Sequence, residues 1–131
     1  MPCAVAGCIL AGLALVIDGD TLHIGPDKIR LHAINAPERH EPGGREATTA
    51  LRSIIAGRQV RCTWDGTRTR GRYVAVCRVG GVDVARELVW RGLAAACPRF
   101  SRRYDADEGV AKARRSGIWR YRYVKPRWCE R

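Results

Sequence analysis

Residues 16–24 read VIDGDTLHI, two short apolar runs joined by an Asp-Gly-Asp turn. Asp-Gly is a frequent signal for a tight β-hairpin, so Asp18 and Gly19 predict a turn between antiparallel strands. Turn geometry does not explain Asp20, whose carboxylate would repel that of Asp18. A hard cation such as Ca2+, which takes carboxylate and carbonyl oxygens as ligands, would stabilise the pair; a solvated turn is the alternative.

Strand-like segments continue on both sides of this turn. A Gly-Pro-Asp turn at residues 25–27 leads into a third strand, so the first three strands predict an antiparallel meander. Two further segments are rich in β-branched and aromatic residues and are joined by the polar residues 65–70. The five predicted strands span residues 13–17, 21–24, 29–34, 60–64 and 73–79.

Three helices complete the pattern. The first spans residues 46–56 and stops at Gly57, Asp83 caps a second that runs to Trp90, and Ser101 caps a third that ends at Gly117 with Ile118 behind it. The residues predicted to face the core are Ala47, Leu51, Ile54 and Ile55 on the first helix and Ala106, Val110 and Ala113 on the third. This order of elements predicts an α+β fold, mainly β: a five-stranded OB-fold barrel with three helices.

Length and charge limit the function classes. A chain of 131 residues forms one domain, 1–131. The net charge is +11, and nearly all of the 24 cations are arginine, whose planar fork binds phosphate or carboxylate at two points. Genome base composition is an alternative reason for arginine over lysine, but it does not explain the net charge. We therefore expect a polyanionic partner.

The six cysteines and the N-terminal segment bear on the compartment. No C-x-x-C pair occurs, so a zinc site is not expected, and scattered cysteines favour disulfides. Cys62 and Cys77 lie on predicted neighbouring strands and are candidates for a bridge, two adjacent core thiols being the alternative. Residues 1–12 resemble a signal remnant or an N-terminal extension and are too short to span a bilayer. We expect a periplasmic or secreted protein, with a cytoplasmic one as the alternative, a monomer, and no membrane partner.

Three short motifs follow one another along the chain. They are Asp18-Gly19-Asp20-Thr21, the stretch IRLHAINAPE at residues 29–38, and Arg70-Gly71-Arg72, with Gly117-Ile118-Trp119 closing the last helix. Together they resemble the pattern of the staphylococcal nuclease (thermonuclease-like) family. The resemblance runs from about residue 13 to residue 119 in matching order. It implies an OB-fold nuclease that uses Ca2+ to hydrolyse single-stranded or unwound DNA or RNA, leaving 3′-phosphate ends.

The resemblance also assigns roles to individual residues. Asp20, the side chain of Asn35 and the main-chain carbonyl of Ala36 would bind Ca2+, with Asp18 close behind them. Arg30 and Arg72 would clamp the scissile phosphate and stabilise the charge of the transition state. Glu38 would orient or deprotonate the attacking water.

Two positions depart from the family pattern, and two segments have two interpretations. Asn35 stands where the family usually has an aspartate, and Arg70 stands where it usually has an aromatic residue. The tail at residues 120–128, RYRYVKPRW, could stack on bases, although packing back on the barrel is the favoured interpretation. Residues 41–44 are either a loop that covers substrate or a surface loop.

The alternative to a nuclease is a nonenzymatic OB-fold module that binds single-stranded nucleic acid or a protein partner. None of the three histidines is assigned to catalysis.

Overall fold

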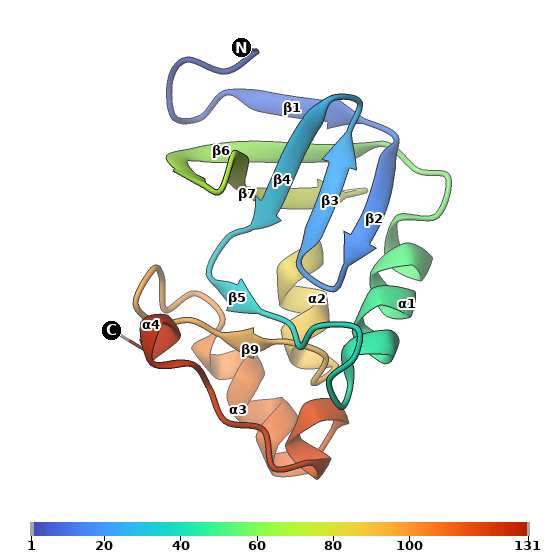
Figure 1. Ribbon diagram of the computed structural model, residues 1–131, viewed down its shortest axis with the longest axis vertical. Helices are drawn as coiled ribbons and strands as arrows, with labels where there is room; N and C mark the ends of the chain where they lie inside the picture. Colours follow the sequence, from blue (N-terminus) through green and yellow to red (C-terminus); the bar gives the residue numbers. More distant parts are fainter. Residues whose placement is uncertain (1, 131) are drawn as a thin grey trace.

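The computed structural model describes residues 2–130 as a curled, mostly antiparallel sheet with helices at its side and at one end (Figure 1). Hydrogen bonds order the main sheet as β1-β6-β7-β4-β3-β2, with β8 paired to β7; the β4–β7 pair is parallel, and β5 and β9 form a separate antiparallel pair. The strands are β1 Ile9–Gly12, β2 Ala14–Asp18, β3 Thr21–Ile24, β4 Asp27–Leu31, β5 Ile34–Asn35, β6 Val60–Thr69, β7 Arg72–Val79, β8 Val82–Asp83 and β9 Ala95–Ala96.

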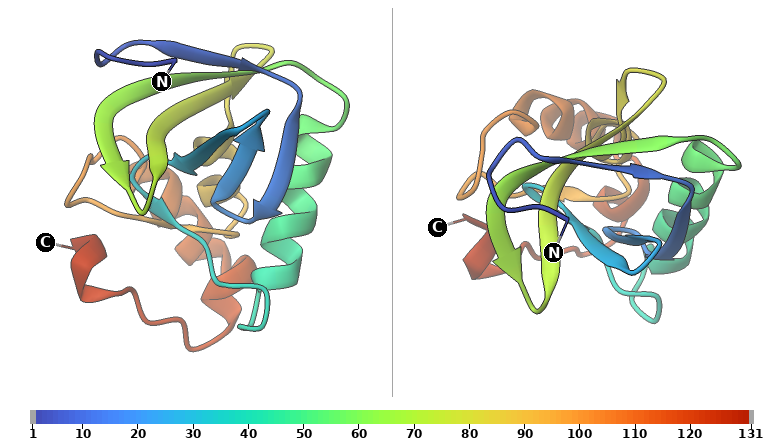
Figure 2. Two further views of the ribbon diagram at one scale, coloured as in Figure 1. Left: turned by 45° about the horizontal axis from the view of Figure 1, so that its top comes forward. Right: turned by 90° about the horizontal axis from the view of Figure 1, so that it is seen from above.

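The predicted α+β class is confirmed, whereas the closed five-stranded barrel is not. Leu13 alone separates β1 from β2, and the chain bends at Gly12, where φ is 154°. As a result β1 pairs with β6 and β2 pairs with β3. In the described chain the two ends of the curled sheet are joined by this bend rather than by a hydrogen-bonded ladder (Figure 2).

The predicted strand at residues 29–34 is interrupted. It ends as β4 at Leu31, and β5 begins at Ile34 after Ala33 adopts a φ of 59°. Few residues with a Cβ adopt this left-handed conformation. The break turns the chain away from the main sheet, so that Asn35 pairs with Ala95 of β9 instead.

Residues 2–130 also contain four α-helices and one 3₁₀-helix: α1 Gly44–Ile55, α2 Val84–Trp90, α3 Asp105–Arg114, η1 Gly117–Arg120 and α4 Arg127–Glu130. Helix α1 packs against β2, while α2, α3 and the C-terminal segment lie beyond one end of the main sheet, on the side of the β5–β9 pair (Figure 1). Ala47, Leu51 and Ile55 of α1 are buried as predicted, whereas Ile54 is only partly buried. The Asp83 carboxylate accepts from the Arg86 N–H, which confirms the cap of α2.

The prediction for α3 was wrong in its start and its buried face. The helix starts at Asp105, after Tyr104, and Ser101 does not cap it. Ala106, Val110 and Ala113 are exposed, while the buried residues of α3 are Glu108 and Ala111. Counting alanine and valine as inward residues missed a buried carboxylate. That carboxylate is stabilised because it accepts from the Ala96 N–H at 2.9 Å and pairs with Lys125 at 2.9 Å.

Three disulfides join the described cysteines: Cys3–Cys8, Cys62–Cys77 and Cys97–Cys129. Cys62 and Cys77 are directly opposite one another on β6 and β7, which confirms the predicted bridge. Within residues 2–130, no helix has the length and apolar character needed to cross a bilayer.

Candidate active site

The Asp-Gly-Asp turn brings β2 and β3 close to helix α1. The Asp18 carboxylate accepts from the Asp20 N–H at 3.2 Å and so holds the turn. A Cβ on Gly19 would lie 2.7 Å from the Cβ of Ala47 and 2.8 Å from that of Ala36. Gly19 is therefore required by this close approach, as well as suited to a turn.

Asp20 is the buried carboxylate of the site. Its Oδ1 accepts from the Thr21 hydroxyl at 3.1 Å, its Oδ2 accepts from the Ala36 N–H at 2.9 Å, and the Arg30 guanidinium lies 3.5 Å from Oδ2. Burial raises the pKa of the Asp20 carboxyl, and the charge of Arg30 partly offsets this effect. The Asp18 and Asp20 carboxylates thus each have their own hydrogen-bond partners, which offset the repulsion expected between them.

The parallel pairing of β4 with β7 places two arginines on one face of the sheet. Arg30 is opposite Val74, and Arg72 lies two residues before Val74, so Arg30 and Arg72 point to the same side. Arg72 donates to the Thr21 hydroxyl at 3.2 Å, and Arg30 donates to the Leu31 carbonyl at 2.8 Å. Burial and the neighbouring Arg30 lower the pKa of the Arg72 guanidinium.

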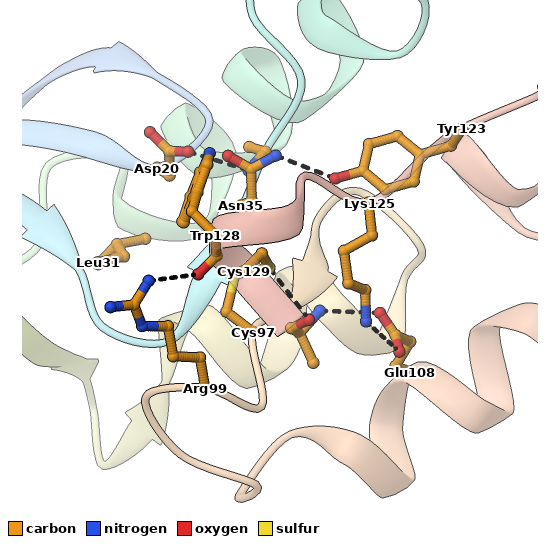
Figure 3. Close-up of a disulfide and its surroundings, with 12 residues drawn as sticks. Asp20, Leu31, Asn35, Cys97, Arg99, Glu108, Tyr123, Lys125, Trp128 and Cys129 are labelled. Carbon is orange, nitrogen blue, oxygen red and sulfur yellow. Dashed lines mark hydrogen bonds and ion pairs between the residues drawn. A yellow bond between two sulfur atoms is a disulfide. The ribbon is translucent and has the colours of Figure 1, made fainter. Parts of the chain in front are cut away.

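The side chain of Asn35 is hydrogen-bonded to the C-terminal segment. Its amide nitrogen donates to the Tyr123 hydroxyl at 3.0 Å, and its oxygen is on the Asp20 side (Figure 3). Tyr123 also packs edge-to-face on Trp119, with ring centroids 5.4 Å apart. This contact is consistent with the tail packing back on the fold. Burial raises the pKa of the Tyr123 hydroxyl.

Glu38 is not in contact with the other candidate residues. Its side chain is 73% exposed and faces His40, and its N–H donates to the Glu41 carboxylate at 2.7 Å. A Cβ on Gly44 would collide with the Glu38 carbonyl, so this glycine allows the loop at residues 38–44 to fold tightly at the start of α1. The structure therefore places Glu38 on the loop beside the cluster. Asp18, Arg30 and Ala36 contact Asp20 directly, and Arg72 is joined to Asp20 through the Thr21 hydroxyl.

The predicted ligands are oxygen atoms, which suit a hard cation, but few of them carry a negative charge. Within residues 2–130, no group of three or more His, Cys, Asp or Glu side chains could hold a metal ion. The oxygens predicted as ligands from the sequence are the carboxylates of Asp18 and Asp20, the Asn35 amide and the Ala36 carbonyl; in the structure Ala36 contacts Asp20 through its N–H. Oxygen ligands of this kind fit Ca2+. Because Asn35 replaces the usual aspartate, the set carries two negative charges instead of three.

Sequence reasoning missed Thr21 and Tyr123. Thr21 stands inside the Asp-Gly-Asp-Thr motif, so the motif itself carried the signal for its hydroxyl, which bridges Asp20 and Arg72. Tyr123 and Asn35 are 88 residues apart, and no local pattern indicates that they meet.

Comparison with known proteins identifies the family of the chain. The model of the family described as staphylococcal nuclease homologue matches residues 28–121, so the chain belongs to that family. The match includes Arg30, Asn35, Glu38 and Arg72, whereas the Asp-Gly-Asp turn precedes it.

The chain is also similar to individual named proteins. It is 35% identical over 124 residues to the succinoglycan biosynthesis protein ExoI of Rhizobium meliloti (strain 1021), covering 85% of this chain and 65% of that protein. It is 28% identical to an uncharacterized endonuclease of Escherichia coli, covering 88% of this chain and 80% of that protein. A probable staphylococcal-like nuclease, CAN3, of Oryza sativa subsp. japonica is 30% identical, with coverages of 70% and 25%. The chain thus spans less than two thirds of the first of these relatives.

Proposed function

We propose that this protein is a Ca2+-dependent nuclease that hydrolyses DNA or RNA and leaves 3′-phosphate ends. The observation that supports this most strongly is the arrangement of Arg30 and Arg72 around the buried Asp20. Two guanidinium groups that point to the same side of the sheet could bind a phosphate between them, because a phosphate is negatively charged. The family membership points in the same direction.

The guanidiniums would act on the phosphate group. Arg30 and Arg72 would donate hydrogen bonds to its non-bridging oxygens, and these bonds strengthen as negative charge grows in the transition state. Because Thr21 and Asp20 hold the two side chains before substrate arrives, little reorganisation is needed.

Asp20, the Asn35 amide oxygen and the Ala36 carbonyl would hold the cation, with Asp18 supporting the turn behind them. The ion would supply Lewis-acid polarisation of a phosphoryl oxygen. Glu38 would orient or deprotonate the attacking water. Its exposed position means that the loop at residues 38–44 would have to bring it to the cluster when substrate binds.

The exposed Glu38 also favours a second candidate function. A chain that keeps the phosphate-binding arginines without a positioned base could bind single-stranded nucleic acid, or a protein partner, without cleaving it. This alternative and the nuclease make opposite predictions in a cleavage assay.

Three disulfides support an oxidising compartment, since such bonds rarely persist in a reducing cytosol. We therefore propose a periplasmic or secreted location. We also propose that the protein acts as a monomer.

Digestion of single-stranded DNA, with Ca2+ or with chelator, tests the proposal. The expected result is cleavage that requires Ca2+ and yields 3′-phosphate ends identified by mass spectrometry. Full activity in chelator would contradict the assignment, and tight binding without cleavage would favour the nonenzymatic module.

A further inference from the structure

One face of β7 carries cations well beyond the candidate active site. Side chains alternate along a strand, so Arg72, Val74, Val76 and Arg78 share a face. Arg78 lies six positions after Arg72 on the strand, a distance of about 20 Å. A polyanion bound by Arg72 could therefore extend along the same face to Arg78.

Arg78 lies directly opposite another arginine. The register of β6 and β7 pairs it with Arg61, and like charges at this position destabilise a sheet. Neither arginine belongs to an ion pair among residues 2–130. A bound anion would relieve the repulsion.

A groove of about 360 Å³ runs over this face, between β6–β7 and the loop that precedes α3. Its walls include Thr63, Val76 and Arg78 from the sheet and Phe100 and Arg103 from the loop. One carboxylate lines it, that of Asp65, which is 2.8 Å from His32 Nδ1 and also accepts from Thr67. The buried carboxylate of Asp83, the other cross-strand neighbour of Arg78, accepts from the Tyr104 hydroxyl at 2.8 Å. The acidic groups near the groove thus have partners of their own.

An exposed aromatic pair stands on the loop side of the groove. Phe100 is 52% exposed and Trp128 is 45% exposed, with ring centroids 6.4 Å apart. The Arg99 guanidinium lies 5.5 Å from the Phe100 ring and 3.5 Å from the Trp128 carbonyl. The Cys97–Cys129 disulfide fixes the two segments that carry these rings (Figure 3). Rings held in this way lose little entropy when a base stacks on them.

We propose that this groove is a nucleic-acid subsite, in which single-stranded DNA or RNA that leaves the Arg30–Arg72 cluster places a base against Phe100 and phosphates near Arg78 and Arg103. The proposal rests on the proposed function for the identity of the polyanion. Positive charge paired with exposed aromatic rings is the combination that binds single strands without sequence preference.

The test measures binding separately from cleavage. Fluorescence anisotropy of a labelled single-stranded DNA is titrated with the full chain carrying Arg72→Ala, alone and combined with Phe100→Ala, Phe100→Trp or Arg78→Ala. Arg52→Ala, the same charge change on exposed α1, is the matched control. Thermal unfolding of each variant verifies that it is folded.

Phe100→Ala is expected to weaken binding about tenfold, and Phe100→Trp to restore it, because stacking needs an aromatic face. Arg78→Ala should weaken binding and reduce the slope of log K against log salt by roughly 0.7 for each phosphate that the protein no longer neutralises, while Arg52→Ala changes affinity less than either. Equal losses of affinity for Arg52→Ala and Arg78→Ala, or no effect of Phe100→Ala, would overturn the subsite.

Cleavage by the protein with Arg72 intact is assayed in parallel, so that the two proposals fail separately. Cleavage with no effect of the groove variants on binding overturns the subsite alone. Groove-dependent binding by a protein that does not cleave supports the subsite and overturns the nuclease.

Discussion

At the scale of single residues, Asp20 is the most constrained group in the site. Its two oxygens accept from the Thr21 hydroxyl and the Ala36 N–H, and Arg30 lies beside them. These contacts fix the carboxylate before any ligand arrives. Of the proposed side-chain ligands, Asn35 is the one without a charge. A substitution at this position therefore tests whether the site binds a cation.

Asn35→Asp should lower the Ca2+ concentration needed for half-maximal cleavage. A carboxylate adds one unit charge toward a divalent ion, worth about 2 kcal/mol at 4 Å in water, or roughly thirtyfold in affinity before desolvation reduces it. The measurement is a Ca2+ titration of cleavage at fixed ionic strength, with calorimetry of Ca2+ binding beside it. An unchanged or higher requirement would show that position 35 is not a ligand, whereas Asp20→Ala should abolish the response.

Tyr123→Phe should raise the same Ca2+ requirement roughly threefold to tenfold, the value of one hydrogen bond. Removing the hydroxyl leaves the Asn35 amide nitrogen without its acceptor, so the amide oxygen is no longer fixed toward Asp20. Tyr121→Phe, at an exposed tyrosine of the same tail, is the matched control. Equal effects of the two substitutions on Ca2+ binding would refute a positioning role for Tyr123.

At the scale of elements, the connection of α2 to α3 depends on the buried pair Tyr104 and Asp83. Burial and then the Asp83 carboxylate raise the pKa of the Tyr104 hydroxyl, so the folded protein holds the phenolic proton more tightly than the unfolded chain. The resulting stability is fully present below the ordinary tyrosine pKa of about 10 and is lost as pH rises above it.

Tyr104→Phe should therefore lower the free energy of unfolding by about 1 to 3 kcal/mol near neutral pH. The difference from the natural sequence should shrink above about pH 10, where the unfolded chain gains by ionising its tyrosine. Urea unfolding at several pH values measures both effects. A difference that grows with pH would contradict the assigned hydrogen bond.

The Cys62–Cys77 bridge between β6 and β7 closes a loop of 15 residues. In the chain-entropy account it stabilises the fold by about 3 kcal/mol. Replacing both cysteines by alanine should lower the free energy of unfolding by about that amount, measured by guanidinium unfolding without reductant. A loss well below about 1 kcal/mol would show that strain or residual structure cancels the entropy gain.

How far the sequence predicts these elements depends on whether the signal is local. The Asp83 cap and the buried face of α1 follow from residues a few positions apart, and both were predicted. The break at Ala33 and the buried Glu108 depend on partners from β9 and the C-terminal segment. Periodicity carries no information about such distant partners. This is why the predicted strand at residues 29–34 is longer than β4 and why the wrong face of α3 is predicted to be buried.

At the scale of the whole molecule, 24 Lys and Arg side chains outnumber 13 Asp and Glu side chains, which gives the net charge of +11. The sequence predicted the family, because the family pattern is carried by short motifs, while the polyanionic partner stays a prediction. It did not predict that Asn35 is held by Tyr123 or that Glu38 is exposed, since both depend on how a loop and the C-terminal segment fold over the site.

The central claim is that Arg30 and Arg72, held by Asp20 and Thr21, act on a phosphate. The measurement that tests it most directly is the single-turnover cleavage rate of single-stranded DNA in saturating Ca2+ by Arg72→Ala, with Arg70→Ala as the matched control two residues away. Removal of one hydrogen-bond donor to the transition state predicts a rate at least about a hundredfold lower for Arg72→Ala, and a change of less than about threefold for the exposed Arg70. Equal rates for Arg72→Ala and the natural sequence would contradict the account.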